Sequence, residues 1–177
     1  MNGIKKYLLN FRNKHFLKRI DLLRKTLNYQ DVKSVGVIFL THDEQMHEHL
    51  NNFVKKMKDD KKNVTAITYF DRLHDNPYLF RYDFFTEKDI SLFGEVKCRE
   101  TEQFINTEFD YLYCISTEAE IDVFEPILAK CKAKCRIGNY RESKETLFEL
   151  MIHIKQEQNI DILIQEMLRY TQAIRFN

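Results

Sequence analysis

Residues Ser34–Phe70 read SVGVIFLTHDEQMHEHLNNFVKKMKDDKKNVTAITYF, and this stretch decides the fold. Val35–Leu40 is a continuous apolar run, which is typical of a central strand covered on both faces. Val64–Phe70 is a second such run. The segment between them carries one apolar stripe at helical spacing, made of Met46, Leu50, Phe53, Val54 and Met57. The stretch therefore predicts a βαβ unit, the building block of a parallel α/β sheet.

The turn between this first strand and its helix is where such sheets usually hold a ligand phosphate. Here Thr41 and Glu44 have the spacing of a capping box, which predicts that the helix begins at this point. The turn has no glycine, and it carries two carboxylates, Asp43 and Glu44, where a phosphate needs positive charge. We therefore interpret the turn as a helix cap.

The rest of the chain continues the alternation of strands and helices. It predicts a helix over 3–28, a strand over 80–84, a turn capped by Thr86 and Asp89, a helix over 101–106, strands over 109–115 and 133–137, and helices over 117–130, 142–156 and 159–174. Lys134 and Arg136 should face outward, which places the strand over 133–137 at a sheet edge. We expect one Rossmann-like, open, mostly parallel α/β sheet of about five strands, with the first strand central and helices on both faces. A basic N-terminal helix (domain 1–30) and a C-terminal helix pair complete the expected α/β domain, 31–177.

Composition limits the class of protein. The 177 residues include only four glycines and two prolines, which favours long regular elements. No apolar stretch approaches the roughly 20 residues of a membrane span, and charges break up the N-terminal run that a signal peptide would need. The four cysteines fit no disulfide or zinc spacing, so we expect reduced structural thiols. These features indicate a cytoplasmic protein.

Charge is unevenly distributed along the chain. Residues 1–30 carry a net charge of +7, so the remainder carries −6 against the total of +1. The cations of this segment are Lys5, Lys6, Arg12, Lys14, Lys18, Arg19, Arg24 and Lys25. A basic amphipathic helix can bind nucleic acid, a membrane surface or a protein groove, or it can be the solvated face of a helix docked on its own domain.

Motifs for chemistry are few. In the run His42–His49, Asp43 and His47 share a helical face, as two metal ligands would. There is no His-Glu-x-x-His pattern, so we interpret the run as a solvated helix face and not as a metal site. Neither a nucleophile elbow nor a glycine-rich phosphate loop is present, since no two glycines lie within 30 residues of each other. We expect no cofactor. The aromatic residues over 69–93 could stack on nucleic acid, but core packing accounts for them better.

Two resemblances follow from particular segments. Phe109-Asp110-Tyr111-Leu112 and Ala133–Gly138 resemble strands in the amino-terminal half of heptosyltransferase-type GT-B glycosyltransferases. The catalytic Gly-Asp of those enzymes has no counterpart in Leu40–Asp43, and their nucleotide-sugar-binding half is missing. This likeness therefore implies architecture and not the transfer reaction.

The fuller resemblance rests on the basic N-terminal helix, the Val-Gly-Val-Ile strand, Asp83–Asp89 through Phe93-Gly94, and Ile137-Gly138. It is to a family of small uncharacterised bacterial proteins, a domain of unknown function. It implies a fold and no known activity.

These observations favour a non-enzymatic cytoplasmic domain that binds RNA or a ribonucleoprotein through the N-terminal cations, with peripheral membrane association as an alternative. A second alternative is a small-molecule-binding protein or enzyme. Its site would lie at the carboxyl ends of the strands, near Thr41, His42, Asp43, Ser116 and Thr117, with Asn139 and Tyr140 as neighbours.

Overall fold

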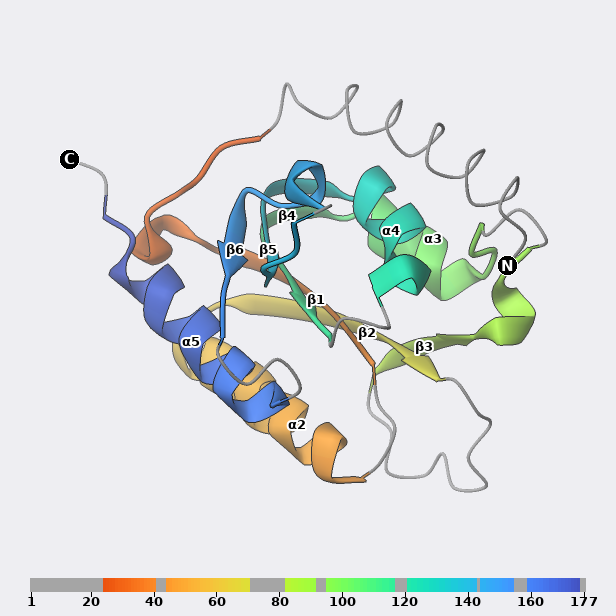
Figure 1. The fold of residues 1–177 in the computed structure, drawn as a ribbon, viewed down its shortest axis with the longest axis horizontal. Helices are drawn as coiled ribbons and strands as arrows, with labels where there is room; N and C mark the ends of the chain where they lie inside the picture. The colour runs from red at the N-terminus through yellow and green to blue at the C-terminus, as the bar shows by residue number, and fades with distance from the viewer. Residues whose placement is uncertain are drawn as a thin grey trace.

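The protein is an open parallel sheet with helices packed against both faces, as the computed structural model shows (Figure 1). The structure describes residues 24–40, 44–70, 82–91, 95–116, 121–142, 144–154 and 159–175. Within them the strands are β1 (Ser34–Leu40), β2 (Asn63–Phe70), β3 (Asp83–Thr86), β4 (Glu108–Ile115), β5 (Lys132–Asn139) and β6 (Leu150–Ile152). The helices are α2 (Glu44–Asp59), α3 (Arg99–Asn106), α4 (Ile121–Lys130) and α5 (Ile160–Ala173), with short 3-10 turns η2 (Tyr29–Asp31), η4 (Glu87–Asp89) and η6 (Glu145–Leu147).

The strand order is β3-β2-β1-β4-β5-β6, and every neighbouring pair is parallel. The predicted Rossmann-like α/β class is confirmed, with β1 inside the sheet and six described strands where about five were expected. This order belongs to the doubly wound folds, in which the chain runs outward from β1 in one direction and from β4 in the other. All strand ends of one kind therefore lie along one edge. We call the edge of strand starts the amino edge and the edge of strand ends the carboxyl edge.

Two apolar layers hold the sheet. Val35, Val37 and Phe39 of β1 pack with α2 and α5 on one face, while Ile38 and Leu40 pack with α3 and α4 on the other. Figure 1 shows the same division, with the α2–α5 pair and the α3–α4 pair on opposite sides of the strands. Because β1 is buried on both faces, its sequence is continuously apolar, as the prediction assumed.

Gly36 and Gly138 are needed for close packing. A Cβ on Gly36 would lie 2.7 Å from Leu112 Cδ1, and one on Gly138 would lie 2.5 Å from the ring of Phe148. The sequence predicted a close neighbour for Gly36, and the structure identifies it as β4.

The predicted helix over 142–156 is wrong. That segment contains η6 and the strand β6, which pairs with β5 through Ile137 and Leu150. Because β6 covers the outer side of β5, the strand predicted over 133–137 is not at the edge of the sheet. Its Arg136, predicted to face outward, is 0 % exposed, whereas Lys134 is exposed as predicted.

The predicted helix over 3–28 does not include its last five residues. Residues 24–28 form no helix, because their backbone bonds to the sheet instead: Lys25 N–H donates to Lys134 O at 2.8 Å. The rest of that prediction lies outside the described residues. Among the residues that are described, no helix has the length and apolar character to cross a bilayer.

Candidate functional site

The predicted macromolecule-binding cations fall into two groups. Lys5, Lys6, Arg12, Lys14, Lys18 and Arg19 lie outside the described residues. Arg24 and Lys25 are described, and both lie against the amino edge of the sheet. They show how the basic N-terminal segment is joined to the domain.

Arg24 is an anchor. Its Nε lies 2.9 Å from Glu149 Oε1, and its Nη2 donates to Thr146 O at 3.1 Å. Glu149 is itself held by β5, since its Oε2 accepts from Arg136 N at 2.7 Å and its N–H donates to Arg136 O at 3.0 Å. A half-buried ion pair with this many hydrogen bonds positions the chain. Arg24 is therefore engaged in the fold and does not count among the cations available to a partner.

Residues 27–32 continue along the amino edge in fixed contact with it. Leu27 O accepts a hydrogen bond from Tyr111, and Tyr29 donates to Asp60 Oδ2 at 2.6 Å. The pKa of Tyr29 is raised to about 12, mainly by burial and secondly by this bond to Asp60. The phenol therefore stays protonated and acts as a donor.

Lys62 is the most enclosed lysine described at this edge. Its Nζ donates to Tyr29 O at 2.7 Å and to Val32 O at 2.6 Å, and it lies 4.6 Å from the centre of the Tyr29 ring. Burial lowers the pKa of Lys62, while Asp60, Asp110 and Asp31 act in the opposite direction. Two carbonyl acceptors and an aromatic face satisfy the ammonium, so its role is to fasten the N-terminal segment.

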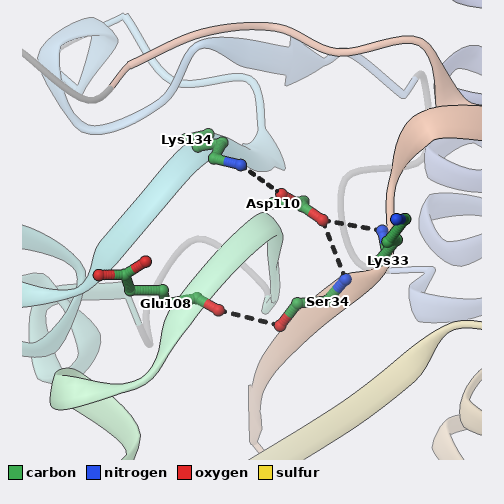
Figure 2. A network of polar contacts seen from close by, with 5 residues as sticks. All are labelled: Lys33, Ser34, Glu108, Asp110 and Lys134. Atoms are coloured by element: carbon green, nitrogen blue, oxygen red, sulfur yellow. Dashed lines mark hydrogen bonds and ion pairs between the residues drawn. The ribbon is translucent and has the colours of Figure 1, made fainter.

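Asp110 is the centre of the polar network in Figure 2. One carboxylate oxygen accepts from the backbone N–H groups of Lys33 (2.8 Å) and Ser34 (3.0 Å), and the other lies 2.7 Å from Lys134 Nζ. Burial alone would raise the pKa of Asp110, but the hydrogen bonds from Lys134, Lys33 and Ser34 hold that pKa below its ordinary value. The carboxylate thus acts as the acceptor for the start of β1, a structural task.

The alternative ligand site is at the carboxyl edge. Phe39 and Ile115 are register partners, so the ends of β1 and β4 lie side by side. The helix after β1 covers one face of the sheet and the helix after β4 covers the other. Such a switch point opens a crevice for ligands in doubly wound sheets. Ser116 stands at this point, buried, with its Oγ 3.9 Å from Cys114 Sγ; Thr41, His42, Asp43 and Thr117 lie outside the described residues.

Sequence reasoning missed one polar residue at this edge. Arg141 follows β5 and is 6 % exposed, close in sequence to the buried Asn139. A guanidinium is the side chain best suited to bind a carboxylate or phosphate in two-point fashion. One arginine after a strand looks like an ordinary loop residue, so the sequence offered no signal of its burial.

His47 and His49 belong to the polar run 42–49, whose first residues, His42 and Asp43, lie outside the described ranges. Across the described ranges, no three His, Cys, Asp or Glu side chains are placed to hold an ion. His47 is buried beside the Tyr82 ring at 5.8 Å, and His49 Nδ1 lies 2.6 Å from Asp161 Oδ1 of α5. These two histidines therefore pack α2 against its neighbours.

The cysteines are free, as expected. Burial raises the pKa of Cys131 and of Cys135 to about 12, which keeps both as unreactive thiols. The aromatic region divides: Phe85 is in the core beside Phe124, whereas Phe84 on edge strand β3 is exposed and contacts Phe70.

A family of unknown function (DUF6913) matches residues 5–174. This match spans almost the whole chain, so the protein belongs to that family, and the expected membership of a domain of unknown function is confirmed. No curated protein matches the sequence. The local likeness to heptosyltransferase-type enzymes gains no support from the family match.

Proposed function

We propose that this member of the DUF6913 family is a cytoplasmic, non-catalytic protein that binds RNA or a ribonucleoprotein through its basic N-terminal segment. The observation that carries the proposal is the concentration of positive charge in residues 1–30, a net +7 on a chain whose total is +1. Binding to a phosphate backbone requires dense lysine and arginine and no dedicated pocket.

The anchor at Arg24 supports this proposal by giving the segment a fixed origin. The ion pair with Glu149 and the bond from Lys25 N–H to Lys134 O fix where the chain leaves the sheet. The cations from Lys5 to Arg19 all precede that point in the sequence. Their number exceeds what solubility of a small domain requires.

The test uses the full chain with six glutamines, at Lys5, Lys6, Arg12, Lys14, Lys18 and Arg19. Substitution is preferable to truncation, because a chain starting at Tyr29 would also lose the Arg24–Glu149 pair and the Leu27–Tyr111 bond. Binding to a fluorescent RNA is measured by anisotropy between 50 and 200 mM salt. We expect the unsubstituted chain to bind more weakly as salt rises and the sixfold variant to lose most of its affinity. RNA binding that is absent at low salt, or unchanged across the salt range, would refute the proposal.

Anionic vesicles form the parallel arm of this test. Flotation that depends on the same six cations, together with no RNA binding, would assign the segment to a membrane surface instead.

A second candidate function is small-ligand binding at the carboxyl edge. The adjacency of the β1 and β4 ends favours it, together with the buried Ser116, Asn139 and Arg141. A thermal-shift screen of nucleotides and sugar phosphates tests it on the unsubstituted protein. A ligand that raises the melting temperature should do so less in Ser116→Ala or Arg141→Gln, and a panel without a single hit would remove this candidate.

A further inference from the structure

The amino edge exposes lysines that have no structural task for their side chains. Their ammonium groups are exposed and have no ion-pair partner among the described residues: Lys25, Lys33, Lys58, Lys61 and Lys132. We call these five residues the lysine edge. In Lys25 and Lys33 the backbone carries the structural hydrogen bonds, to Lys134 O and Asp110 Oδ2, while the side chain is left to solvent.

The hydrogen bonds of the backbone show that these lysines are neighbours. Lys25 is bonded to Lys134, two residues along β5 from Lys132. Lys134 and Lys33 share the carboxylate of Asp110, as Figure 2 shows. Lys33 O in turn accepts from Asn63 N at 2.8 Å, beside Lys61, whose own N–H donates to Lys58 O at 2.9 Å. The row therefore crosses the starts of β5, β4, β1 and β2 and spans about 15 Å, three strand spacings of roughly 4.8 Å.

Three acids of the same edge form hydrogen bonds inside the protein, and one of them, Asp110, is also neutralised by a lysine. Asp110 is bonded to two backbone amides and Lys134, Asp60 accepts from Tyr29, and Asp31 accepts from Asn28 Nδ2 at 3.2 Å. Asp31, Asp59, Asp60 and Glu108 are all exposed, so the five lysines keep a small positive excess over the four exposed carboxylates of this edge.

At the opposite, carboxyl edge, Asp122 and Asp161 lie in the first turns of α4 and α5, and Glu87 and Asp89 lie in the turn after β3. Asp122 is paired with Lys144 at 3.2 Å and Asp161 with His49 at 2.6 Å, while the cations Lys88, Lys97 and Arg99 are exposed near the same edge. The row of lysines that have no ion-pair partner among the described residues therefore makes the amino edge the more favourable approach for an anion.

We propose that the lysine edge is a second RNA-binding surface, in addition to the basic N-terminal segment, and that it contacts phosphates without reading sequence. This inference rests on the proposed function and assigns to the sheet itself a share of the same partner. Arg24 and Lys25, the first described residues, are bonded to the sheet beside the lysine edge, since Lys25 N–H donates to Lys134 O.

The chemistry of this edge suits RNA better than a lipid surface. Interfacial membrane binding requires exposed apolar side chains beside the cations. Among the described residues, the large exposed hydrophobic side chains are Phe84, Tyr140 and Tyr170. Phe84 lies on the edge strand β3 and Tyr140 directly follows β5. Tyr170 lies in the last turn of α5, where the Arg169 guanidinium is 4.3 Å from the centre of its ring.

The experiment compares two triple variants of the full chain that remove equal charge from opposite edges. Lys33→Gln/Lys61→Gln/Lys132→Gln alters the lysine edge, and Lys88→Gln/Lys97→Gln/Arg99→Gln is the matched control near the carboxyl edge. All six side chains are exposed, so both variants should unfold at the same urea concentration as the unsubstituted protein. Anisotropy with a fluorescent RNA is then measured over a salt series for both triples and for the sixfold N-terminal variant.

We expect the lysine-edge triple to make the slope of log K against log salt shallower by about 2 to 3, because each phosphate that a lysine neutralises adds roughly 0.7–0.9 to that slope. The control triple should keep the original slope. Equal weakening in both triples would show that total charge and not position matters, and would overturn the inference. Unchanged binding by the lysine-edge triple, with weaker binding by the N-terminal variant, would also overturn it, while leaving the proposed function intact.

If the full chain binds no RNA at low salt, both proposals are refuted. If it then floats with anionic vesicles, and the lysine-edge triple does not, this surface binds a membrane instead.

Discussion

At the amino edge of the sheet, Asp110 and Lys62 make several short hydrogen bonds to the backbone, whereas at the carboxyl edge the Ser116 hydroxyl has, within the described ranges, one long contact, to the Cys114 thiol at 3.9 Å. Both edges bury polar groups. At the amino edge these groups bond to the backbone at the start of β1 and just before it. Buried polar groups that satisfy backbone amides contribute strongly to stability, because removing one leaves its partners unsatisfied. The comparison indicates that the amino edge is built for stability, and that Ser116 at the carboxyl edge can be changed with little effect on the fold.

The largest expected effect is that of Asp110→Ala. The change leaves the N–H groups of Lys33 and Ser34 without their acceptor and Lys134 without its ion pair. We expect a decrease of about 2–4 kcal/mol in the free energy of unfolding, measured in urea. Asp59→Ala is the control, since that exposed carboxylate makes no bond in the part of the chain described and should change stability by less than about 0.5 kcal/mol. Equal effects for the two variants would contradict the network in Figure 2.

The same carboxylate predicts a pH dependence. The folded pKa of Asp110 is lowered, so its stabilisation is fully present above the unfolded value of about 3.9 and is lost as pH falls through the folded pKa. The difference in unfolding free energy between the unsubstituted protein and Asp110→Ala should therefore be constant near neutral pH and shrink below about pH 4. A difference that persists undiminished to pH 2 would mean that the carboxylate contributes through packing alone.

Gly138→Ala tests the packing between the sheet and the segment before β6. A methyl group there would lie 2.5 Å from the buried Phe148 ring, so we expect the free energy of unfolding to fall by about 1–3 kcal/mol. In an open strand position, replacing glycine by alanine should instead stabilise by roughly 0.5–1 kcal/mol, so the sign of the change is decisive. Adding Phe148→Leu should recover part of the stability in a double-mutant cycle.

Ser116→Ala probes the carboxyl edge directly. Because the hydroxyl's contact in the described part of the chain is a long one to sulfur, we expect the free energy of unfolding to change by less than about 1 kcal/mol. A ligand found for this edge should nevertheless bind more weakly to the variant. If the variant were as unstable as Asp110→Ala, the contrast between the two edges would fail.

The smallest expected effect is a gain. Lys61 lies two residues after the last residue of α2, Asp59, and has a positive φ of 62°, a conformation that favours glycine. Lys62 N–H closes this turn onto Met57 O at 3.0 Å. Lys61→Gly should raise the free energy of unfolding by about 0.5–1 kcal/mol. Lys58→Gly, inside the helix three residues earlier, should lower it by about 1 kcal/mol, which provides the internal control.

The sequence predicted those parts of the fold that have a clear period. The unit β1–α2–β2, the strands β4 and β5, and the central place of β1 follow from apolar runs and one helical stripe. The Thr86–Asp89 capping box was also predicted, and Thr86 N–H donates to Asp89 Oδ2 at 2.8 Å. Local hydrogen bonds of this kind depend on neighbours in sequence, so a single sequence is enough to find them.

The predictions that were wrong concern segments whose structure depends on partners far away in the sequence. β6 has only three residues, and it is a strand because β5 supplies its hydrogen bonds. Residues 24–28 leave the predicted helix because Lys134 and Tyr111 bind their backbone from more than 80 residues away. The Arg136 side chain was predicted to be exposed because charged residues that alternate in an edge strand normally face water. It is buried because β6, which was not predicted, pairs with β5. Of the candidate site, the sequence correctly placed Ser116 at the carboxyl end of a strand, but the burial of Arg141 left no pattern to recognise.

The fixed departure of the chain at Arg24 has a kinetic and thermodynamic consequence. In the proposed complex, the Arg24–Glu149 pair would hold the start of the RNA-binding segment near Lys25 and Lys33 of the sheet. The second set of contacts then forms within one complex, at an effective concentration in the millimolar range for a short linker. Two individually weak surfaces would in this way give an overall affinity about 10² to 10⁴ times higher than either alone.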